Sequence, residues 1–560
     1  MKNIYFLIFG VLLFSGCDTY LDKEYDASLS EDKVFTSDKL TREFLTNIYT
    51  YLPNGFWGYG DQSASGATFD VVTDNAQTSW PIHIQNRINN NTFTSSDNPL
   101  GWYWSNYMTA IRKCNVFLAN SSRAGISDKT VTGDENHLLT RYNAEARLMR
   151  ALDHFWLVSY FGDAPIITHA FSMDNQAEMN MHRTNAADVL KWVADECDSV
   201  KGSLPFHWAS EGNWGRVNAG VALALKSRAL LYRASPLFNK DNNASWWTDA
   251  TNAAQEFMTA NAASDIKYGL YVAGGATSYG QMFYVSPFTV NEFILNRSVW
   301  NNLAIDDASV SSGFTGNSGH NNPSQNLVDA YETTKGKPIG EDATYNPQNP
   351  YINRDPRLGM TVFYNGSIWG NPTKRPMDMS TGGLDMQGSQ QSLTGYYLKK
   401  WCSPDINYTD KKPIGRAWVI FRYAEILLNY AEAKNETLLT PDQSIYDAIN
   451  AIRTRAGLIN LPTGLTKDQM RTKIWNERRV ELAFEDHRYL DVRRWRIFDN
   501  PTLKTDYLTL RKTTITKSGR TTTYAYSTQQ ERQFEEKNYF FPIPYSETIK
   551  APNLGQNFGW

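Results

Sequence analysis

The hydrophobic positions of this chain recur mostly with the period of a helix. Between Ala144 and Val158 the apolar residues follow steps of four, three, four and three, which places them on one helical face. Gly162 and Pro165 come directly afterwards and predict that this helix ends there. The Ala- and Leu-rich segment 217–234 has the same character and is followed by Pro236.

The C-terminal third repeats this pattern with clearer end signals. Apolar faces recur at 424–431 and at 445–452, and Gly457 offers a left-handed stop after the second segment. The residues Thr466 to Gln469 form a capping box, which predicts a helix that runs through Met470 and Ile474 toward Phe484.

Together these segments predict a mainly α fold. Helical blocks are expected near 40–50, 100–120, 140–160, 185–200, 217–260 and 418–490. They come as pairs with Ala-rich faces, which is typical of tetratricopeptide-like (TPR-like) packing, although no clean 34-residue consensus is present. We therefore expect a TPR-like helical-pair scaffold in a single large domain.

Two regions depart from the helical period. Residues 262–415 are rich in Gly, Asn, Ser, Pro and aromatic residues, and so is the shorter stretch 53–104. Long irregular segments inside a compact protein usually carry recognition surface. We divide the chain into an N-terminal part (18–260), an irregular insertion (about 262–415) and a C-terminal helical part (about 416–560).

The first 17 residues have the form of a lipoprotein signal peptide. Lys2 precedes an apolar run from Ile4 to Phe14, which at about 1.5 Å per residue is too short to cross a bilayer core of about 30 Å. Small residues then lead directly to Cys17, the position at which a lipoprotein would be cleaved and acylated. We expect Cys17 to attach the mature chain to a membrane through several acyl chains, because one chain alone binds only marginally.

Composition narrows the chemistry further. The net charge of -3 gives no electrostatic footprint for nucleic acid. The eight histidines show no metal-binding spacing, and the cysteines form no CxxC pair, so we expect neither a metal nor a cofactor. With Cys17 modified, an odd number of cysteines remains and we expect no disulfide framework.

Acidic and basic residues crowd the segment 477–494. Glu477 and Glu481 lie four residues apart on one helical face, which is the kind of carboxylate pair that a glycosidase uses. The abundant arginines nearby would hold these acids ionised, however, and an ionised acid cannot donate a proton. We interpret the segment as a structural ion-pair network.

Aromatic residues next to Asn and Asp are the candidate ligand contacts. A sugar ring presents an apolar face that lies flat on Trp or Tyr, while its hydroxyl groups need polar partners at the rim. The candidates are Trp57, Tyr59, Asp74, Asn75, Trp80, Trp102, Tyr103, Trp300 and Phe314. For each single aromatic residue core packing competes with ligand stacking, but we expect at least two of them to contact ligand.

Several motifs resemble the SusD/RagB family of bacterial surface nutrient-binding lipoproteins. They are residues 422–425 (RYAE), 450–458 (NAIRTRAGL), 477–495 (ERRVELAFEDHRYLDVRRW) and 553–560 (NLGQNFGW), with Asp486 at a position where the family often has Gly. The resemblance implies an outer-membrane lipoprotein that faces the cell surface. It also implies capture of glycans, without cleavage, and delivery to a SusC-like TonB-dependent transporter.

Three other functions stay open at this point. The same scaffold could capture peptides or glycoprotein-derived ligands, which a groove rich in backbone hydrogen bonds would favour. A surface glycan hydrolase would need paired carboxylates of raised pKa in an aromatic cleft. A scaffold with only protein partners would show an apolar concave face without exposed Trp.

Overall fold

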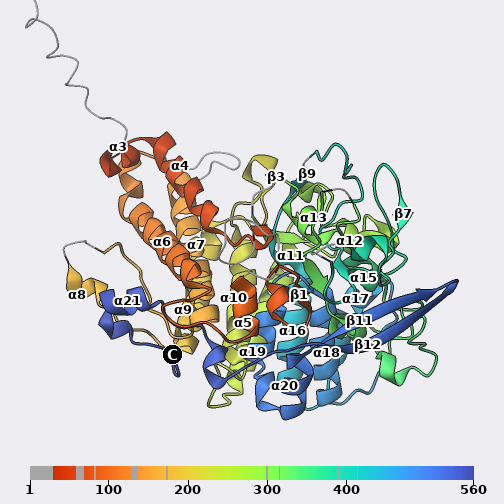
Figure 1. The fold of residues 1–560 in the computed structure, drawn as a ribbon. Helices are drawn as coiled ribbons and strands as arrows, with labels where there is room; N and C mark the ends of the chain where they lie inside the picture. The colour runs from red at the N-terminus through yellow and green to blue at the C-terminus, as the bar shows by residue number, and fades with distance from the viewer. Residues whose placement is uncertain are drawn as a thin grey trace, which may run out of the picture.

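A computed structural model describes residues 30–57, 68–80, 84–128, 137–171, 175–297, 300–314, 316–387, 391–412 and 414–560. Long helices fill one side of the molecule and shorter elements fill the other (Figure 1). Among the residues described, no helix is both long and apolar enough to cross a bilayer. Within the same residues, no group of His, Cys, Asp and Glu side chains could hold a metal ion.

The long helices pack one against the next in chain order. Helix α6 packs on α7, α7 on α9, α9 on α10, α10 on α11, α11 on α16, and α16 on both α17 and α18. Their bounds are α6 Gly101–Asn120, α7 Leu138–Phe161, α9 Ala186–Val200, α10 Ala219–Ala234, α11 Ser245–Ala263, α16 Tyr423–Thr437, α17 Gln443–Arg455 and α18 Lys467–Glu481. This succession of packed helices confirms the mainly α, TPR-like prediction.

The predicted helix ends are mostly correct. Gly162 takes a φ of 73° after α7, and the ring of Phe540 lies only 3.1 Å from the position that a Cβ would take. Gly457 takes a φ of 79° just after α17, and the capping box of Thr466 and Gln469 opens α18. Helix α18 ends at Glu481, however, and does not reach Phe484, whose φ of 62° is incompatible with a helix.

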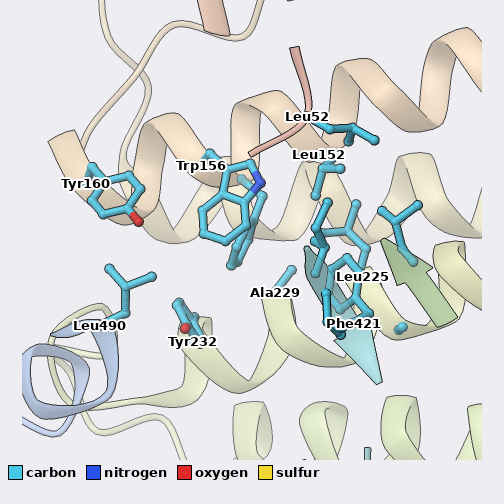
Figure 2. Close-up of a cluster of buried hydrophobic side chains, with 14 of the residues drawn as sticks. Leu52, Leu152, Trp156, Tyr160, Leu225, Ala229, Tyr232, Phe421 and Leu490 are labelled. Carbon is cyan, nitrogen blue, oxygen red and sulfur yellow. The ribbon is translucent and has the colours of Figure 1, made fainter. Parts of the chain in front are cut away.

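The core lies where α7 and α10 face each other. Leu152, Trp156 and Tyr160 of α7 point toward Leu225 and Tyr232 of α10 (Figure 2). Phe421 of strand β10 (Val419–Arg422) and Leu490 of helix α19 (Arg488–Arg494) close the cluster. Alanines between α9, α10 and α11 let these helices approach closely, as the Ala-rich sequence predicts.

Short elements dominate between α11 and α16. The helices there are α12 (Ser278–Gln281), α13 (Ala304–Ser309), α14 (Gln325–Ala330) and α15 (Pro356–Thr361). The strands are β2 (Phe293–Asn296), β3 (Trp300–Asn302), β4 (Asn321–Pro323), β5 (Val362–Phe363), β6 (Ile368–Trp369), β7 (Arg375–Pro376), β8 (Tyr397–Leu398) and β9 (Ile414–Arg416). They form two-stranded pairs: β4 with β1 (Ala76–Thr78), β2 with β10, β3 with β9, β5 with β8 and β6 with β7. The absence of a long helical period in this sequence is thus matched by its structure.

A long hairpin near the C-terminus was not predicted. Strand β11 (Thr509–Ser518) pairs with β12 (Thr521–Glu531), and the hairpin extends away from the body (Figure 1). Gly519, with a φ of 59°, forms part of its tip. The remaining helices are α3 (Glu31–Phe35), α4 (Asp38–Ile48), α5 (Ile84–Asn89), α8 (Gln176–Met179), α20 (Pro501–Leu508) and α21 (Tyr545–Lys550).

Candidate functional site

The two carboxylates that sequence spacing placed on one helical face lie inside an ion-pair network. Glu477 accepts from Arg357 at 2.6 Å and from Arg453 at 3.2 Å. Glu481 accepts from Arg357 at 2.9 Å and from Arg422 at 2.7 Å, and it also pairs with Arg455. All of these side chains are buried, so each charge is neutralised by a neighbour and not by water.

The network continues into the following turn and determines the protonation state of its acids. Glu485 binds Arg422 and Lys400, both at 2.6 Å. Burial alone would raise the pKa of Glu481, but the guanidinium groups of Arg455 and Arg422 hold it far below its ordinary value. The same balance lowers the pKa of Glu485. The expectation of a structural ion-pair network is confirmed. Neither Glu481 nor Glu485 is in the protonated state that a general acid requires. We call this set the Glu481 network: Glu292, Arg357, Lys400, Arg422, Arg453, Arg455, Glu477, Glu481 and Glu485.

Asp74 and Asn75, two predicted ligand contacts, are engaged inside the protein. The carboxylate of Asp74 accepts from Arg488 at 2.9 Å and from Arg479 at 2.8 Å. Asn75 donates to Asp70 at 2.8 Å and accepts from Arg479 at 2.9 Å. Because both side chains are buried and bonded, we do not carry them into the proposed site.

Trp80 lies on a small aromatic stack. Strands β1 and β4 run antiparallel, with Thr78 opposite Asn321, so the residues just beyond them, Trp80 and His320, are brought together. The two rings stack with centroids 4.9 Å apart, and Trp80 is partly exposed. Burial lowers the pKa of His320, which keeps its ring neutral at neutral pH. The pair offers a flat, uncharged surface.

Trp102 stands at the start of α6, beside two neighbours of opposite environment. Its side chain is 49% exposed, whereas Tyr103 is 4% exposed and Trp104 is fully buried. A helix turns each residue by about 100° from the last, so only Trp102 faces outward here. Tyr103 packs in the core, edge-on to Trp102, and we do not carry it into the proposed site.

An open groove of about 610 Å³ lies against Trp102. Its other wall is helix α21, on which Tyr545 is 53% exposed and Ile549 is 61% exposed. A backbone bond from Tyr545 to Ser95 of 3.0 Å joins the two walls, and Asn98 donates to the carbonyl of Pro542 at 2.7 Å. We call this the aromatic groove; its lining is Ser95, Ser96, Asn98, Gly101, Trp102, Ser105, Pro544, Tyr545, Ser546, Ile549 and Lys550.

The groove combines the two kinds of contact that a sugar needs. Trp102 and Tyr545 supply apolar faces, and four serines with Lys550 supply polar groups. Sequence reasoning found Trp102 and missed Tyr545. The four-residue spacing of Tyr545 and Ile549 after Pro544 was an available signal of a short amphipathic helix.

The other candidates are dispersed. Phe314 is 7% exposed and lies 4.1 Å from the guanidinium of Arg375, inside a separate apolar cluster. Trp57 lies in a short 3₁₀ helix (Gly55–Trp57) and Trp300 in β3, opposite Arg416, but their side chains lie outside the described part of the structure. Tyr59 and Cys17 also lie outside the described residues.

Comparison with known proteins decides the family. A protein-family model described as "SusD family" matches residues 291–560. A second model, described as "Starch-binding associating with outer membrane", matches residues 19–231. The chain belongs to the SusD/RagB family.

The similarity to individual SusD-like proteins extends over nearly the whole chain. A SusD-like protein of Bacteroides ovatus is 23% identical over 86% of this chain and 80% of its own length. A crystal structure of a SusD-like protein from Bacteroides fragilis shares 22% identity, with a TM-score of 0.77 over 95% of this chain and 99% of its own. Another from the same species, named a SusD-like carbohydrate binding protein, shares 26% identity, with a TM-score of 0.74 over 93% and 99%.

Asp486 stands where the resemblance to the family led us to expect Gly. Asp486 has a φ of 62°, the left-handed conformation that Gly adopts without cost. Its carboxylate accepts a hydrogen bond of 2.9 Å from the backbone of Phe69. Asp486 is less suited than Gly to this backbone conformation, but its side chain adds a hydrogen bond between the C-terminal helical part and the N-terminal part.

Proposed function

We propose that this protein is a surface-exposed lipoprotein that binds glycans and delivers them to a SusC-like TonB-dependent transporter. Cys17 anchors it to the outer membrane. It captures the glycan without cutting it. The description of one matching family model as starch-binding and outer-membrane-associated supports this proposal, and so does the name of the 26% identical relative.

The aromatic groove is the observation that carries the proposal. Its volume of about 610 Å³ falls within the usual range for ligand sites of roughly 300–1,000 Å³. Exposed Trp and Tyr side chains are costly in water, and covering about 60 Å² of indole face with a sugar would contribute about 1.5 kcal/mol. We place the sugar ring against Trp102, with hydroxyl groups toward Ser95, Ser546 and Lys550. We propose the Trp80–His320 stack as a second platform for sugar stacking.

The ion pairs of Glu477 and Glu481 support capture without hydrolysis. Glu477 and Glu481 are both buried in ion pairs with arginines, and these arginines hold the pKa of Glu481 far below its ordinary value. A hydrolase needs one protonated and one ionised carboxylate flanking the same bond. We therefore propose binding as the whole activity of this chain.

Affinity electrophoresis tests this function directly. Residues 18–560, produced without the lipid, are run through gels that contain plant, host or microbial polysaccharides, and the same mixtures are assayed for new reducing ends. Retardation by a glycan without new reducing ends supports capture and names the substrate class. New reducing ends would contradict the binding-only proposal. Absence of retardation across the panel, with retention on immobilised peptides, would replace glycan capture with peptide capture.

A further inference from the structure

A second, larger cavity lies on a different part of the molecule. It has a volume of about 640 Å³ and lies between α18, α19, α20 and the base of β11. It shares no lining residue with the aromatic groove, and α21, which walls that groove, lies at the left of Figure 1, away from α18–α20 at the lower centre. We call it the arginine cavity, because Arg479, Arg488 and Arg511 all line it.

The cavity wall carries more positive than negative charge. Arg479 and Arg488 share the single carboxylate of Asp74. Arg532 lies behind the cavity lining, where its charge acts on Asp74. It donates to the backbone carbonyls of Val71, Thr73 and Ala76 and to the side-chain amide oxygen of Gln530, and none of these acceptors carries a charge. Three guanidinium groups thus face one buried carboxylate, and the exposed Asp506 at the rim offsets only one of the two excess charges. Arg511, the remaining arginine, is paired with Asp329.

The clustered arginines shift the pKa values of two residues that line the cavity, Arg479 and Asp74. Burial and the charge of Arg488 lower the pKa of Arg479 to about 10, so it stays charged at neutral pH but is under-neutralised. Burial would raise the pKa of Asp74, yet the arginines hold it below its ordinary value. An anion entering the cavity would therefore gain from charge that the protein itself does not neutralise.

The arginines also have unused hydrogen-bond donors. Arg488 uses Nε and Nη2 on Asp74, and its Nη1 has no acceptor within the described residues. Arg511, whose side chain is 42% exposed, binds Asp329 through Nη2 only, as far as the described residues show. Arg422 in the Glu481 network, by contrast, uses all three nitrogens. A guanidinium with free donors is suited to a planar carboxylate or a sulfate.

An aromatic surface lies beside these donors. Trp475 stacks on Trp495 with centroids 4.4 Å apart and an interplanar angle of 14°. Trp495 is fixed by a 2.7 Å bond from its indole nitrogen to Glu432. Trp475 is partly exposed and lines the cavity, on a support that holds it rigid. A rigid indole next to cationic donors can hold the apolar face and the acidic group of one sugar together.

We propose that the arginine cavity binds a saccharide that carries a carboxylate or a sulfate group. The acidic group lies against Arg488 and Arg511, and the sugar ring lies against Trp475. This second site does not depend on glycan binding in the aromatic groove, so the two proposals fail separately.

The hairpin offers a matched pair of variants. Arg511 and Arg520 lie on the same hairpin, but Arg520 is at the exposed tip, away from the cavity lining. Arg511→Gln and Arg520→Gln remove the same charge. Calorimetric titration of residues 18–560 uses oligogalacturonate, a sulfated galactan oligosaccharide, a neutral gluco-oligosaccharide and inorganic sulfate as separate probes.

Arg511→Gln should bind an acidic oligosaccharide about tenfold more weakly, because one charge-assisted hydrogen bond is lost. Arg520→Gln should change the affinity less than about twofold. Preference for oligogalacturonate would identify the carboxylate as the recognised group, and preference for the sulfated probe would identify the sulfate. Phe288→Ala, which changes an exposed ring outside both cavities, should leave this binding unchanged. Equal losses in the two hairpin variants, no binding of either acidic probe, or inorganic sulfate binding as tightly as the sulfated oligosaccharide would overturn the proposal.

Discussion

The Glu481 network and the aromatic groove differ in how far their key side chains are exposed to water. In the network, Glu481 meets three guanidinium groups, and every member is buried. In the groove, Trp102 and Tyr545 leave about half of their surface in water. A change in the network should therefore alter stability without touching ligand, whereas a change in the groove should alter binding without touching stability. The following substitutions test that separation.

The largest effect is expected from Glu481→Gln. It leaves Arg357, Arg422 and Arg455 without their shared carboxylate, and removing one partner of a buried ion pair costs about 3–5 kcal/mol of unfolding free energy. Urea titration at pH 7 measures this loss. Glu43→Gln is the control, because its pair with Lys39 is exposed and should contribute less than about 0.5 kcal/mol.

The pH dependence of the same variant adds a second test. The folded-state pKa of Glu481 lies below its unfolded value, so the ionised carboxylate stabilises the native state above that unfolded value of about 4.3. This stability is lost as the pH falls through the lower, folded pKa. The difference between the native protein and Glu481→Gln should thus be largest near neutral pH and shrink in acid. A difference that grows in acid would contradict the ion-pair assignment.

The adjacent residues Trp102 and Trp104 sharpen the comparison within one helical turn. Trp104 is fully buried and packs edge-on against Phe161 at 5.2 Å. Trp104→Ala should cost about 3–5 kcal/mol of unfolding free energy. Trp102→Ala should cost less than about 1 kcal/mol, because half of its surface is already exposed. Similar losses in both variants would show that Trp102 is a packing residue.

Asp153, unlike the acids of the Glu481 network, is buried without an ion-pair partner in the described part of the chain, and its substitution should have a smaller effect than Glu481→Gln or Trp104→Ala. It lies buried on α7, its Oδ2 has no hydrogen-bond partner within the described residues, and burial raises its pKa well above the ordinary value. As the pH rises above about 3.9, the unfolded chain ionises Asp153 while the folded chain resists, so the native state loses stability. Asp153→Asn removes that titration.

The variant should therefore gain stability relative to the native protein between pH 4 and pH 7, by on the order of 1–3 kcal/mol. Thermal melting across this range measures it. A constant offset between the two proteins at all pH values would show that Asp153 has an ordinary pKa.

Local patterns predicted the helices but not the partners that meet in space. Gly162, Gly457 and the Thr466 capping box act on their own turns, so the sequence around them was sufficient. The crowding of charges in 477–494 predicted a network, yet Arg357 and Arg422 come from distant segments that no local spacing could identify.

The candidate site was predicted only in part, for the same reason. Composition marked Trp102 and Asp74 alike, because both lie in an aromatic and polar stretch. The position of Trp102 on α6 leaves it exposed, whereas Asp74 is buried in ion pairs with Arg479 and Arg488, which are distant in sequence. Tyr545 reaches the groove through a backbone contact with Ser95, which sequence order does not show.

The central claim is that the aromatic groove binds glycan. The glycan affinity of the Trp102→Ala variant tests it most directly. Phe288→Ala is the matched control, since Phe288 is 50% exposed and lies outside the groove. Both variants are titrated calorimetrically with the glycan that retards the native protein in gels. We expect Trp102→Ala to bind at least about tenfold more weakly, with an unchanged melting temperature, and Phe288→Ala to bind as the native protein does. Unchanged affinity in Trp102→Ala would contradict the claim.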